Sequence, residues 1–417
     1  MWDRILNDML RRLVTLGDLR VTWPDGSETR YGADEPPRAS LRLKDPGIVR
    51  ALCLSPVLAL GEGYMDGRIE IADEMLNPAL GLLQRARERG GRMPAWIETL
   101  NSARMALSVF LQRNTPLTAR ANVAHHYDIS DDLYRLFLDA DMQYSCAYFT
   151  DPEMSLEAAQ EAKKALIARK LRLEPGMRVL DIGCGWGGMA LTLARDHGAR
   201  VLGVTLSQNQ LATAQARAEA AGLADRVEFR LQDYRDVRDS FDRIVSVGML
   251  EHVGRPQFRT YFRKVSELLA PEGVALIHTI GLSSPPSPTS PWLAKYIFPG
   301  GYVPAMSDLA PEIERAGLWM ADIEVLRLHY AWTIRHWRQR FEASRDRIRE
   351  MHDDRFVRMF RFYLAACETA FEEQRQGVFH FQLTKEHAAV PVTRDYLAEP
   401  PGERGARRHG RTRQAAE

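Results

Sequence analysis

The sequence predicts an α/β protein in which a doubly wound, Rossmann-like domain follows a smaller N-terminal α+β domain. An apolar run stops at a cluster of glycines within residues 178–188, and a helical pattern follows at once; this is typical of a buried parallel strand that turns sharply into a helix. Apolar runs and helical patterns then alternate as far as residue 280, which indicates a parallel sheet covered by helices. Before residue 110, short alternating runs and helical patterns stand between glycine- and proline-containing turns.

The N-terminal part begins with an amphipathic helix that starts at Trp2 and carries Leu6, Met9 and Leu13 on its apolar face. Such a helix either lies on a membrane surface or packs on its own domain. The turn residues at 24–27 separate two short alternating runs, which predicts a β-hairpin. Helical patterns follow from residue 46 to residue 105, and we expect the glycine-rich stretch 60–68 to interrupt them as a packed turn.

A helix at 155–172 leads into strands at 178–183, 200–206, 226–232, 241–248 and 274–280. The proline run at 282–292 forbids regular structure, and the aromatic cluster at 296–302 either forms a lid or packs in the core. An arginine-rich helical region covers 328–375, and a last strand is expected at 378–383. We place the domains at 1–110 and 111–395 and expect residues 396–417 to be disordered.

The composition excludes several classes of function. The 417 residues carry a formal net charge of +1, so nothing attracts the whole molecule to nucleic acid, and nucleic acid is not an expected partner. The four cysteines lie far apart without metal-ligand spacing, which favours reduced thiols in a cytoplasmic enzyme. His125 and His126 are adjacent and lack further ligands at coordination spacing, so no metal is expected. The sequence contains no apolar run of about eighteen residues, so no membrane span is predicted.

The glycine-rich turn after the first strand is the first candidate binding site. Glycines let the backbone approach a ligand closely, and the next helix offers free N–H groups to polar or anionic atoms. Gly183, Gly185 and Gly188 also fit a dinucleotide fingerprint by spacing, but that fingerprint needs an acidic residue after the next strand. The strand at 200–206 ends in Val-Thr-Leu-Ser, whereas Asp181 directly precedes the glycines. This pattern is that of methyltransferases that use S-adenosylmethionine (SAM), so we expect SAM.

Further candidates lie where the predicted strands end, because ligands of such sheets bind at the carboxyl ends of the strands. These strand-end residues are Asp181, Thr205, Asp233, Glu251 and His278. Ser207 and Gln210 also fit a capping box, a purely structural role. Asp233 and Tyr234 either contact an adenine ring or form a solvated turn pair. Glu251 is interpreted as functional, because a carboxylate at the mouth of a buried strand is costly without a partner.

Several motifs are specific in combination. They are Leu-Gly-Glu-Gly-Tyr-Met-Asp-Gly at 60–67, His-Tyr-Asp at 126–128, Met-Gln-Tyr-Ser-Cys-Ala-Tyr at 142–148, Leu-Asp-Ile-Gly-Cys-Gly-Trp-Gly-Gly at 180–188, Gly-Val-Thr-Leu-Ser at 203–207, Glu-His-Val-Gly at 251–254, His-Thr-Ile-Gly at 278–281 and Lys-Tyr-Ile-Phe-Pro-Gly-Gly at 295–301. Together they resemble the bacterial cyclopropane-fatty-acyl-phospholipid synthase family, kin of the mycolic acid cyclopropane synthases. The resemblance runs from about residue 41 to residue 383.

The resemblance implies a class I SAM-dependent methyltransferase fold and an activity. Such enzymes add the SAM methyl carbon across a cis double bond of a phospholipid acyl chain, and bicarbonate is the base. The residues implied to hold bicarbonate are Cys146, Glu251, His278, Ile280 through its backbone, and Tyr330. The residues implied to bind SAM are Tyr144, Ser145, Asp181, Gly183, Cys184, Gly185, Thr205, Leu206, Ser207, Gln210, Asp233 and Tyr234. In this interpretation the Cys146 thiol is a hydrogen-bond partner of the anion and not a nucleophile.

The implied partners are unsaturated phospholipids and a second copy of the chain, since the family suggests a homodimer. The implied location is cytoplasmic, with peripheral association at the inner face of the membrane. The N-terminal domain would then be of a lipid-binding or dimerisation type, the cluster at 296–302 an acyl-chain gate, and the basic stretch 335–349 either a contact for anionic headgroups or a solvated helix face. Three alternatives stay open: a fatty-acyl methyltransferase with a methyl- or methylene-branched product, a binding module with a degenerate catalytic domain, and a methyltransferase of small soluble acceptors.

Overall fold

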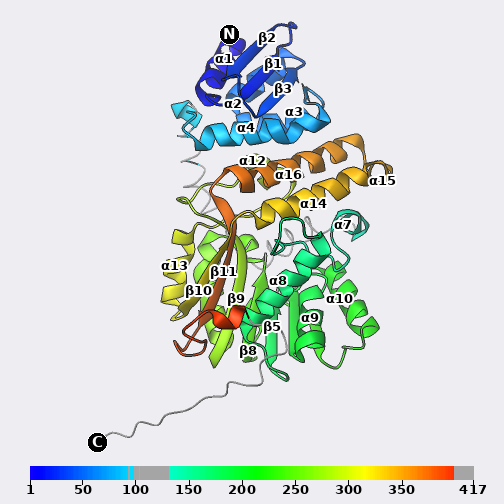
Figure 1. The fold of residues 1–417 in the computed structure, drawn as a ribbon, viewed down its shortest axis with the longest axis vertical. Helices are drawn as coiled ribbons and strands as arrows, with labels where there is room; N and C mark the ends of the chain where they lie inside the picture. The colour runs from blue at the N-terminus through cyan, green and yellow to red at the C-terminus, as the bar shows by residue number, and fades with distance from the viewer. Residues whose placement is uncertain (93, 98, 100–102, 104–130, 399–417) are drawn as a thin grey trace, which may run out of the picture.

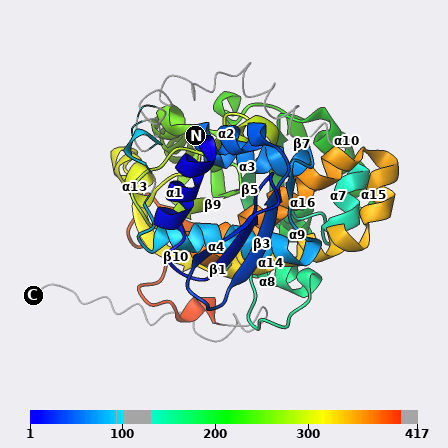
Figure 2. The ribbon, with the colours of Figure 1, turned by 90° about the horizontal axis from the view of Figure 1, so that it is seen from above.

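The described part of the chain is organised around two β-sheets, one of four strands and one of seven. The computed structural model describes residues 1–417 except 93, 98, 100–102, 104–130 and 399–417. Figure 1 shows the N-terminal part stacked on the larger part, with α4 (Leu76–Glu88) and α16 (Asp354–Glu373) along the junction. Viewed from above, the N-terminal elements cover the centre of the larger part (Figure 2). The expected boundary near residue 110 falls outside the described residues, so the division into domains stays a prediction.

The smaller sheet has the order β2-β1-β3-β4. Its strands are β1 (Asp18–Thr22), β2 (Glu28–Gly32), β3 (Arg38–Leu43) and β4 (Ile69–Glu70). The predicted hairpin is confirmed, since β1 and β2 are antiparallel and the Trp23 amide donates to the Ser27 carbonyl at 2.8 Å. Helix α1 (Trp2–Leu13) buries Leu6 and Met9 in the adjoining core, so it packs on its own domain.

The glycine-rich motif at 60–67 is not the packed turn that its composition predicts. Residues 60–65 belong to helix α3 (Pro56–Met65), which follows α2 (Pro46–Leu54). Gly61 lies directly against the Trp292 indole, where a Cβ would collide with the ring. The glycines are therefore needed for close helix packing, and the chain turns only beyond Met65, where Gly67 has φ +69°.

Seven strands form the larger sheet in the order β10-β11-β9-β8-β5-β6-β7. They are β5 (Arg178–Ile182), β6 (Arg200–Thr205), β7 (Val227–Leu231), β8 (Phe241–Val247), β9 (Leu269–Leu282), β10 (Trp319–Leu326) and β11 (Gln376–Thr384). The strands from β5 to β9 pair in parallel, while β11 is antiparallel to both of its neighbours. The doubly wound fold is confirmed with one antiparallel strand, and β10 is an element that the sequence reasoning missed.

Helices lie between and beside these strands. Figure 1 places α8 in front of the sheet and α13 beside β10. The helices of this part are α7 (Asp131–Phe137), α8 (Leu156–Leu171), α9 (Gly188–His197), α10 (Gln208–Ala220), α11 (Phe258–Leu268), α12 (Pro291–Tyr296) and α13 (Met306–Arg315). Helix α12 corrects the expectation that the proline run excludes regular structure, because Pro291 stands in the first turn, where a missing N–H costs nothing. Ile297 and Tyr302 are buried, so this part of the cluster at 296–302 packs in the core.

The arginine-rich region forms α14 (His329–Ala343), α15 (Arg345–Met351) and α16. Its basic residues meet carboxylates: Arg335 and Arg338 both pair with Glu368 of α16, and Arg345 pairs with Asp73 of the smaller domain. These ion pairs join elements to one another, so these three arginines are not merely solvated, and contact of the stretch 335–349 with anionic headgroups stays a prediction.

Two expectations concern the ends of the chain and the membrane. Residues 396 and 397 are not part of a disordered tail, because Asp395–Leu397 forms a short 3₁₀ helix and the Tyr396 hydroxyl donates to Gln382 Oε1 at 2.9 Å. The remaining predicted tail, 399–417, lies outside the described residues. Within the described part of the chain, no helix combines the length and the apolar character that crossing a bilayer requires.

Candidate active site

A pocket opens at the carboxyl ends of β5, β6, β7 and β8. Its wall contains Ile182, Thr205 and Val247 from strand ends, and Tyr144 from the loop before α8. All the predicted SAM residues except Ser207 line this pocket, although they come from several separate segments. Their contact with SAM stays a prediction, and the geometry shows that one ligand can reach them together.

The glycine turn forms one wall of the pocket. Gly183, Gly185 and Gly187 have φ values of +81°, +53° and +85°, a region that side chains with a Cβ rarely adopt. The amides of Gly183 and Cys184 donate to the Val204 carbonyl at 2.9 and 3.1 Å, which ties the turn to β6. Helix α9 begins directly after the turn, so its first N–H groups lie beside the pocket.

Asp181 supplies the pocket with a buried carboxylate. Its side chain is 2% exposed, and Oδ2 has no hydrogen-bond partner among the described residues. Burial raises the pKa of this carboxyl group to about 7, although the Lys163 ammonium acts in the opposite direction. A buried acceptor without a partner fits a cationic donor from a ligand, and the amino-acid end of SAM provides one. The residues present therefore fit SAM.

Other predicted SAM residues lie at or near the ends of β6 and β7. Ser207 caps α10 by accepting from the Gln210 amide at 3.2 Å, and the Gln210 side chain accepts from the Thr205 hydroxyl at 2.9 Å. The predicted cap is confirmed, but Gln210 faces the pocket instead of completing a capping box. Asp233 is buried and pairs with Arg235 at 2.6 Å, so the solvated turn pair is excluded.

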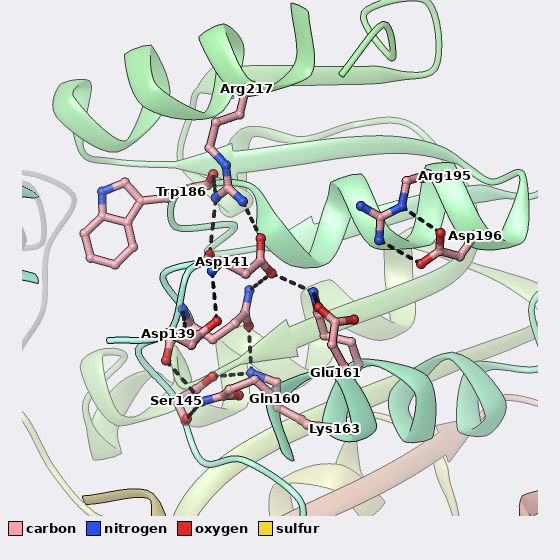
Figure 3. Close-up of polar contacts among 12 residues, drawn as sticks. Asp139, Asp141, Ser145, Gln160, Glu161, Lys163, Trp186, Arg195, Asp196 and Arg217 are labelled. Carbon is pink, nitrogen blue, oxygen red and sulfur yellow. Dashed lines mark hydrogen bonds and ion pairs between the residues drawn. The ribbon is translucent and has the colours of Figure 1, made fainter. Parts of the chain in front are cut away.

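A polar network fixes the loop that carries Tyr144 and Ser145. Asp141 forms ion pairs with Lys164 of α8, at 2.7 Å, and with Arg217 of α10. Figure 3 shows that Asp141 lies between these two helices. The loop is therefore anchored on both sides before it reaches the pocket.

Lys163 is the member of this network that the sequence did not single out. Its side chain is fully buried and donates to Ser145 Oγ at 2.8 Å and to Gln143 Oε1 at 2.6 Å (Figure 3). Burial lowers the pKa of Lys163 to about 8, while the Asp139 and Asp141 carboxylates favour the charged form. The sequence gives no sign of this burial, because a lysine in a helix rich in Ala, Glu and Lys is expected to be exposed. Gln160, one turn earlier in α8, does not indicate it either.

Glu251 and β9 form the centre of the predicted catalytic group. Oε1 of Glu251 accepts from the Ile280 amide at 2.6 Å, and His278 stands two residues earlier on the same strand. Oε2 of Glu251 is buried without a hydrogen-bond partner among the described residues. Burial raises the pKa of this carboxyl group to about 7. An unpaired acceptor here fits a bicarbonate ion, which carries a hydroxyl donor.

Cys146 and Tyr330 are related to each other through α14 (His329–Ala343). The Cys146 thiol is fully buried and donates to the Ala147 carbonyl at 3.3 Å, and burial raises the pKa of the thiol. It therefore stays protonated, which agrees with a hydrogen-bonding role and disfavours a nucleophile. The Ala147 amide donates to Thr333 at 3.0 Å, and Thr333 lies one turn beyond Tyr330. The structure thus joins Glu251 and Ile280 directly, and Cys146 and Tyr330 through neighbouring residues.

Metal chemistry has no described site. His125 and His126 lie outside the described residues. Within the residues that the structure does describe, no three His, Cys, Asp or Glu side chains gather as a metal would need.

A Rossmann-like sheet, a glycine turn and a strand-end pocket with a buried acidic residue define the protein as a SAM-dependent methyltransferase. The chain belongs to the mycolic acid cyclopropane synthetase family, whose model matches residues 114–381. A second family model, described as a domain of unknown function (DUF7884), matches residues 5–77.

Relatives of known name agree with this assignment. The cyclopropane-fatty-acyl-phospholipid synthase of Escherichia coli K12 is 42% identical over 335 residues, which cover 80% of this chain and 84% of that protein. The tuberculostearic acid methyltransferase UfaA1 of Mycobacterium tuberculosis is 35% identical over 398 residues, or 92% and 91% of the two chains. The solved structure of mycolic acid cyclopropane synthase CmaA1 with SAH and CTAB has a TM-score of 0.61 and 32% identity, covering 63% of this chain and 97% of the other.

Proposed function

We propose that this protein is a cyclopropane-fatty-acyl-phospholipid synthase, which adds the SAM methyl carbon across a cis double bond of a phospholipid acyl chain. The observation that carries the proposal is the pair of buried carboxylates, Asp181 in the SAM pocket and Glu251 beside it, each with one oxygen that lacks a partner among the described residues. The name and 42% identity of the Escherichia coli relative support the phospholipid substrate and the cyclopropane product.

The chain's own residues have distinct tasks in this proposal. SAM supplies an electrophilic methyl carbon, and bicarbonate supplies a base for the proton that must leave before the ring closes. Asp181 and the glycine turn hold the SAM end of the site, while Glu251, itself fixed by the Ile280 amide, orients the anion with help from the Cys146 thiol. The ring centroids of Tyr330 and Phe371 are 4.7 Å apart. In this proposal, aromatic rings such as these exclude water and stabilise positive charge on the acyl chain.

A second function keeps SAM and the acyl chain but changes the product. UfaA1, which aligns with 92% of this chain, is named as a tuberculostearic acid methyltransferase. Loss of a proton from the acyl chain, instead of from the new methyl group, would give a branched product on the same scaffold. We further propose that the protein works as a homodimer at the cytoplasmic face of a membrane, where its substrates lie.

The substrate and the base can be tested in one assay of SAH release. Purified protein and SAM are mixed with vesicles of phospholipid carrying one cis double bond per chain, with saturated vesicles as the control. Buffers free of carbon dioxide are compared with the same buffers after bicarbonate is added back. We expect turnover only on unsaturated vesicles and only with bicarbonate. Turnover on a soluble acceptor alone would contradict the lipid substrate, and turnover independent of bicarbonate would contradict the base.

A further inference from the structure

A row of polar groups, most of them buried, crosses three adjacent strands close to Glu251. In the sheet register His278 of β9 is directly paired with His380 of β11, and His380 with Glu324 of β10. Lys170 of α8 lies over this row. His278 is 2% exposed, and His380 and Lys170 are completely buried. Of these residues, only His278 belongs to the predicted catalytic group.

The contacts along the row form a chain. His278 Nδ1 and His380 Nε2 are 2.8 Å apart, and His380 Nδ1 and Lys170 Nζ are 3.4 Å apart. Glu324 Oε2 is 4.0 Å from His380 Nδ1, which is too long for a hydrogen bond. The hydrogen-bond partner of His380 Nδ1 along this row is therefore Lys170.

Lys170 is positively charged in this series of contacts. Its ammonium is 2.6 Å from Glu324 Oε2 and 3.7 Å from an oxygen of Asp322. Burial lowers the pKa of Lys170, whereas these two carboxylates favour its charged form. A charged lysine can only donate hydrogen bonds.

Both imidazoles are neutral. Burial lowers the pKa of His278 and of His380 well below the ordinary value, and the ammonium groups of Lys163 and Lys170 add to this effect at both rings. His329, near His380, acts in the same direction. Each neutral ring therefore has one donor nitrogen and one acceptor nitrogen.

We propose that Lys170 and His380 are positioning residues that hold the proton of His278 on Nε2. Lys170 donates to His380 Nδ1, so the His380 proton lies on Nε2 and is donated to His278 Nδ1. The His278 proton must then lie on Nε2, because Nδ1 accepts from His380. Nε2 takes no part in these contacts and can donate to a ligand in the site. No proton moves along the row. A fixed cation sets the orientation of two hydrogen bonds in turn.

This inference rests on the proposed function and adds a role for His278 in it. An Nε2–H group donates to an anion, whereas the other tautomer would present a lone pair and repel it. Because the ring resists protonation, His278 binds bicarbonate without competing with it for the proton. His380 and Lys170 thereby determine whether the site accepts an anion.

Three substitutions of His380 separate this role from simple packing. In His380→Gln the amide oxygen accepts from Lys170 and the amide N–H donates to His278, so the direction of the chain is preserved. In His380→Glu the carboxylate only accepts, so His278 must place its proton on Nδ1. His380→Leu offers neither group. Thermal unfolding of each variant checks that it folds.

The decisive readout is the tautomer of His278 in the resting full-length enzyme, measured by ¹⁵N NMR of labelled histidines. The His278 signal is assigned by its loss in His278→Asn. We expect a protonated Nε2 in the wild type and in His380→Gln, and a protonated Nδ1 in His380→Glu. A wild-type ring with its proton on Nδ1 would overturn the proposal, whether or not the glutamate variant folds.

Kinetics provide the second readout. In His380→Glu and His380→Leu we expect the apparent KM for bicarbonate to rise about tenfold or more, while the KM for SAM stays unchanged and His380→Gln remains close to wild type. An unchanged bicarbonate KM in a folded His380→Glu variant would overturn the inference. Turnover that needs no bicarbonate in the wild type would instead remove the proposed base, while the NMR result would still decide the tautomer.

Discussion

Asp181 and Glu251 show at the residue scale what burial does to an acidic group in this site. Burial raises the pKa of each carboxyl group from its ordinary value to about 7. The folded protein therefore binds these protons more tightly than the unfolded chain. Stability that the neutral carboxyls provide is present at low pH and is lost as the pH rises from about 4 towards 7.

Replacing Asp181 tests this cost. Asp181→Asn removes a buried charge, so we expect the Tm of the SAM-free protein to rise, more at pH 8 than at pH 5. The variant should bind SAM at least about tenfold more weakly, because the amide no longer offers a carboxylate to a cation. Thermal unfolding at the two pH values and calorimetry with SAM measure both effects. An equal change in Tm at both pH values would contradict the assigned burial cost.

Replacing Glu251 tests its part in turnover. We expect Glu251→Gln to fold and bind SAM as the wild type does, and to lose about a hundredfold or more in turnover. Wild-type activity should increase as the pH rises through about 7, since only the ionised carboxylate presents both oxygens as acceptors, and the variant should lack this dependence. Tyr330→Phe should also keep SAM binding and lose most turnover. Wild-type rates in either variant would remove that residue from the site.

Sequence reasoning located buried polar candidates where a strand end concentrates polar groups, and it missed polar residues whose burial depends on tertiary packing. Asp181 and Glu251 follow apolar runs, so their positions were visible in the sequence. Lys163 and Lys170 stand in a helix rich in Ala, Glu and Lys, and His380 stands in a strand beyond the recognised motifs. Nothing local indicates that Lys170 contacts His380 or that Lys163 contacts Ser145.

At the scale of elements, the buried strands were predicted well because a short apolar run bounded by turns is compatible with few structures besides a buried strand. Strand β10 escaped because its pattern is inverted: Trp319, Ile323 and Val325 are exposed, while Glu324 points towards Lys170. In β10 the apolar residues of the alternating pattern therefore face outwards, and the polar residues make the interior contacts. Helix α3 escaped because its glycines indicate a turn, although they serve close contact with Trp292.

The contact between α3 and α12 gives a prediction at this scale. Gly61→Ala should lower the stability by about 1–3 kcal/mol, because the added methyl group collides with the Trp292 indole. Gly81→Ala in α4 is the matched control, since the nearest atom to its new methyl group is 3.5 Å away. It should be neutral or stabilise by up to about 1 kcal/mol through helix propensity. Chemical denaturation measures both, and equal effects would contradict the packing argument.

At the scale of the whole molecule, α16 connects the two sheets. The Arg85 guanidinium of α4 donates to Glu373 of α16, with Nε 2.7 Å from Oε2, and Asn77 donates to Glu368 at 3.0 Å. Arg361 of α16 forms an ion pair with Asp73 of the N-terminal part. These partners lie nearly 300 positions apart in sequence, so their pairing could not be deduced from local patterns.

We expect Arg85→Gln to weaken this junction by about 1 kcal/mol, since both members of the pair are partly buried. The loss should shrink as salt is added. Arg195→Gln is the control, because its partner Asp196 is its chain neighbour and both side chains are largely exposed. Thermal unfolding at low and high salt compares the two. A larger effect for Arg195→Gln would contradict the role of the junction.

The central claim concerns what happens to the SAM methyl group, and isotopic labelling tests it most directly. Vesicles of unsaturated phospholipid are incubated with the protein and SAM that carries a trideuterated methyl group, and the fatty acids are analysed by mass spectrometry before and after mild hydrogenation. Cyclopropane formation predicts a product that gains one carbon, retains two of the three deuterons and resists hydrogenation. A product that retains all three deuterons, or one that takes up hydrogen, would mean a branched chain and would contradict the proposed function.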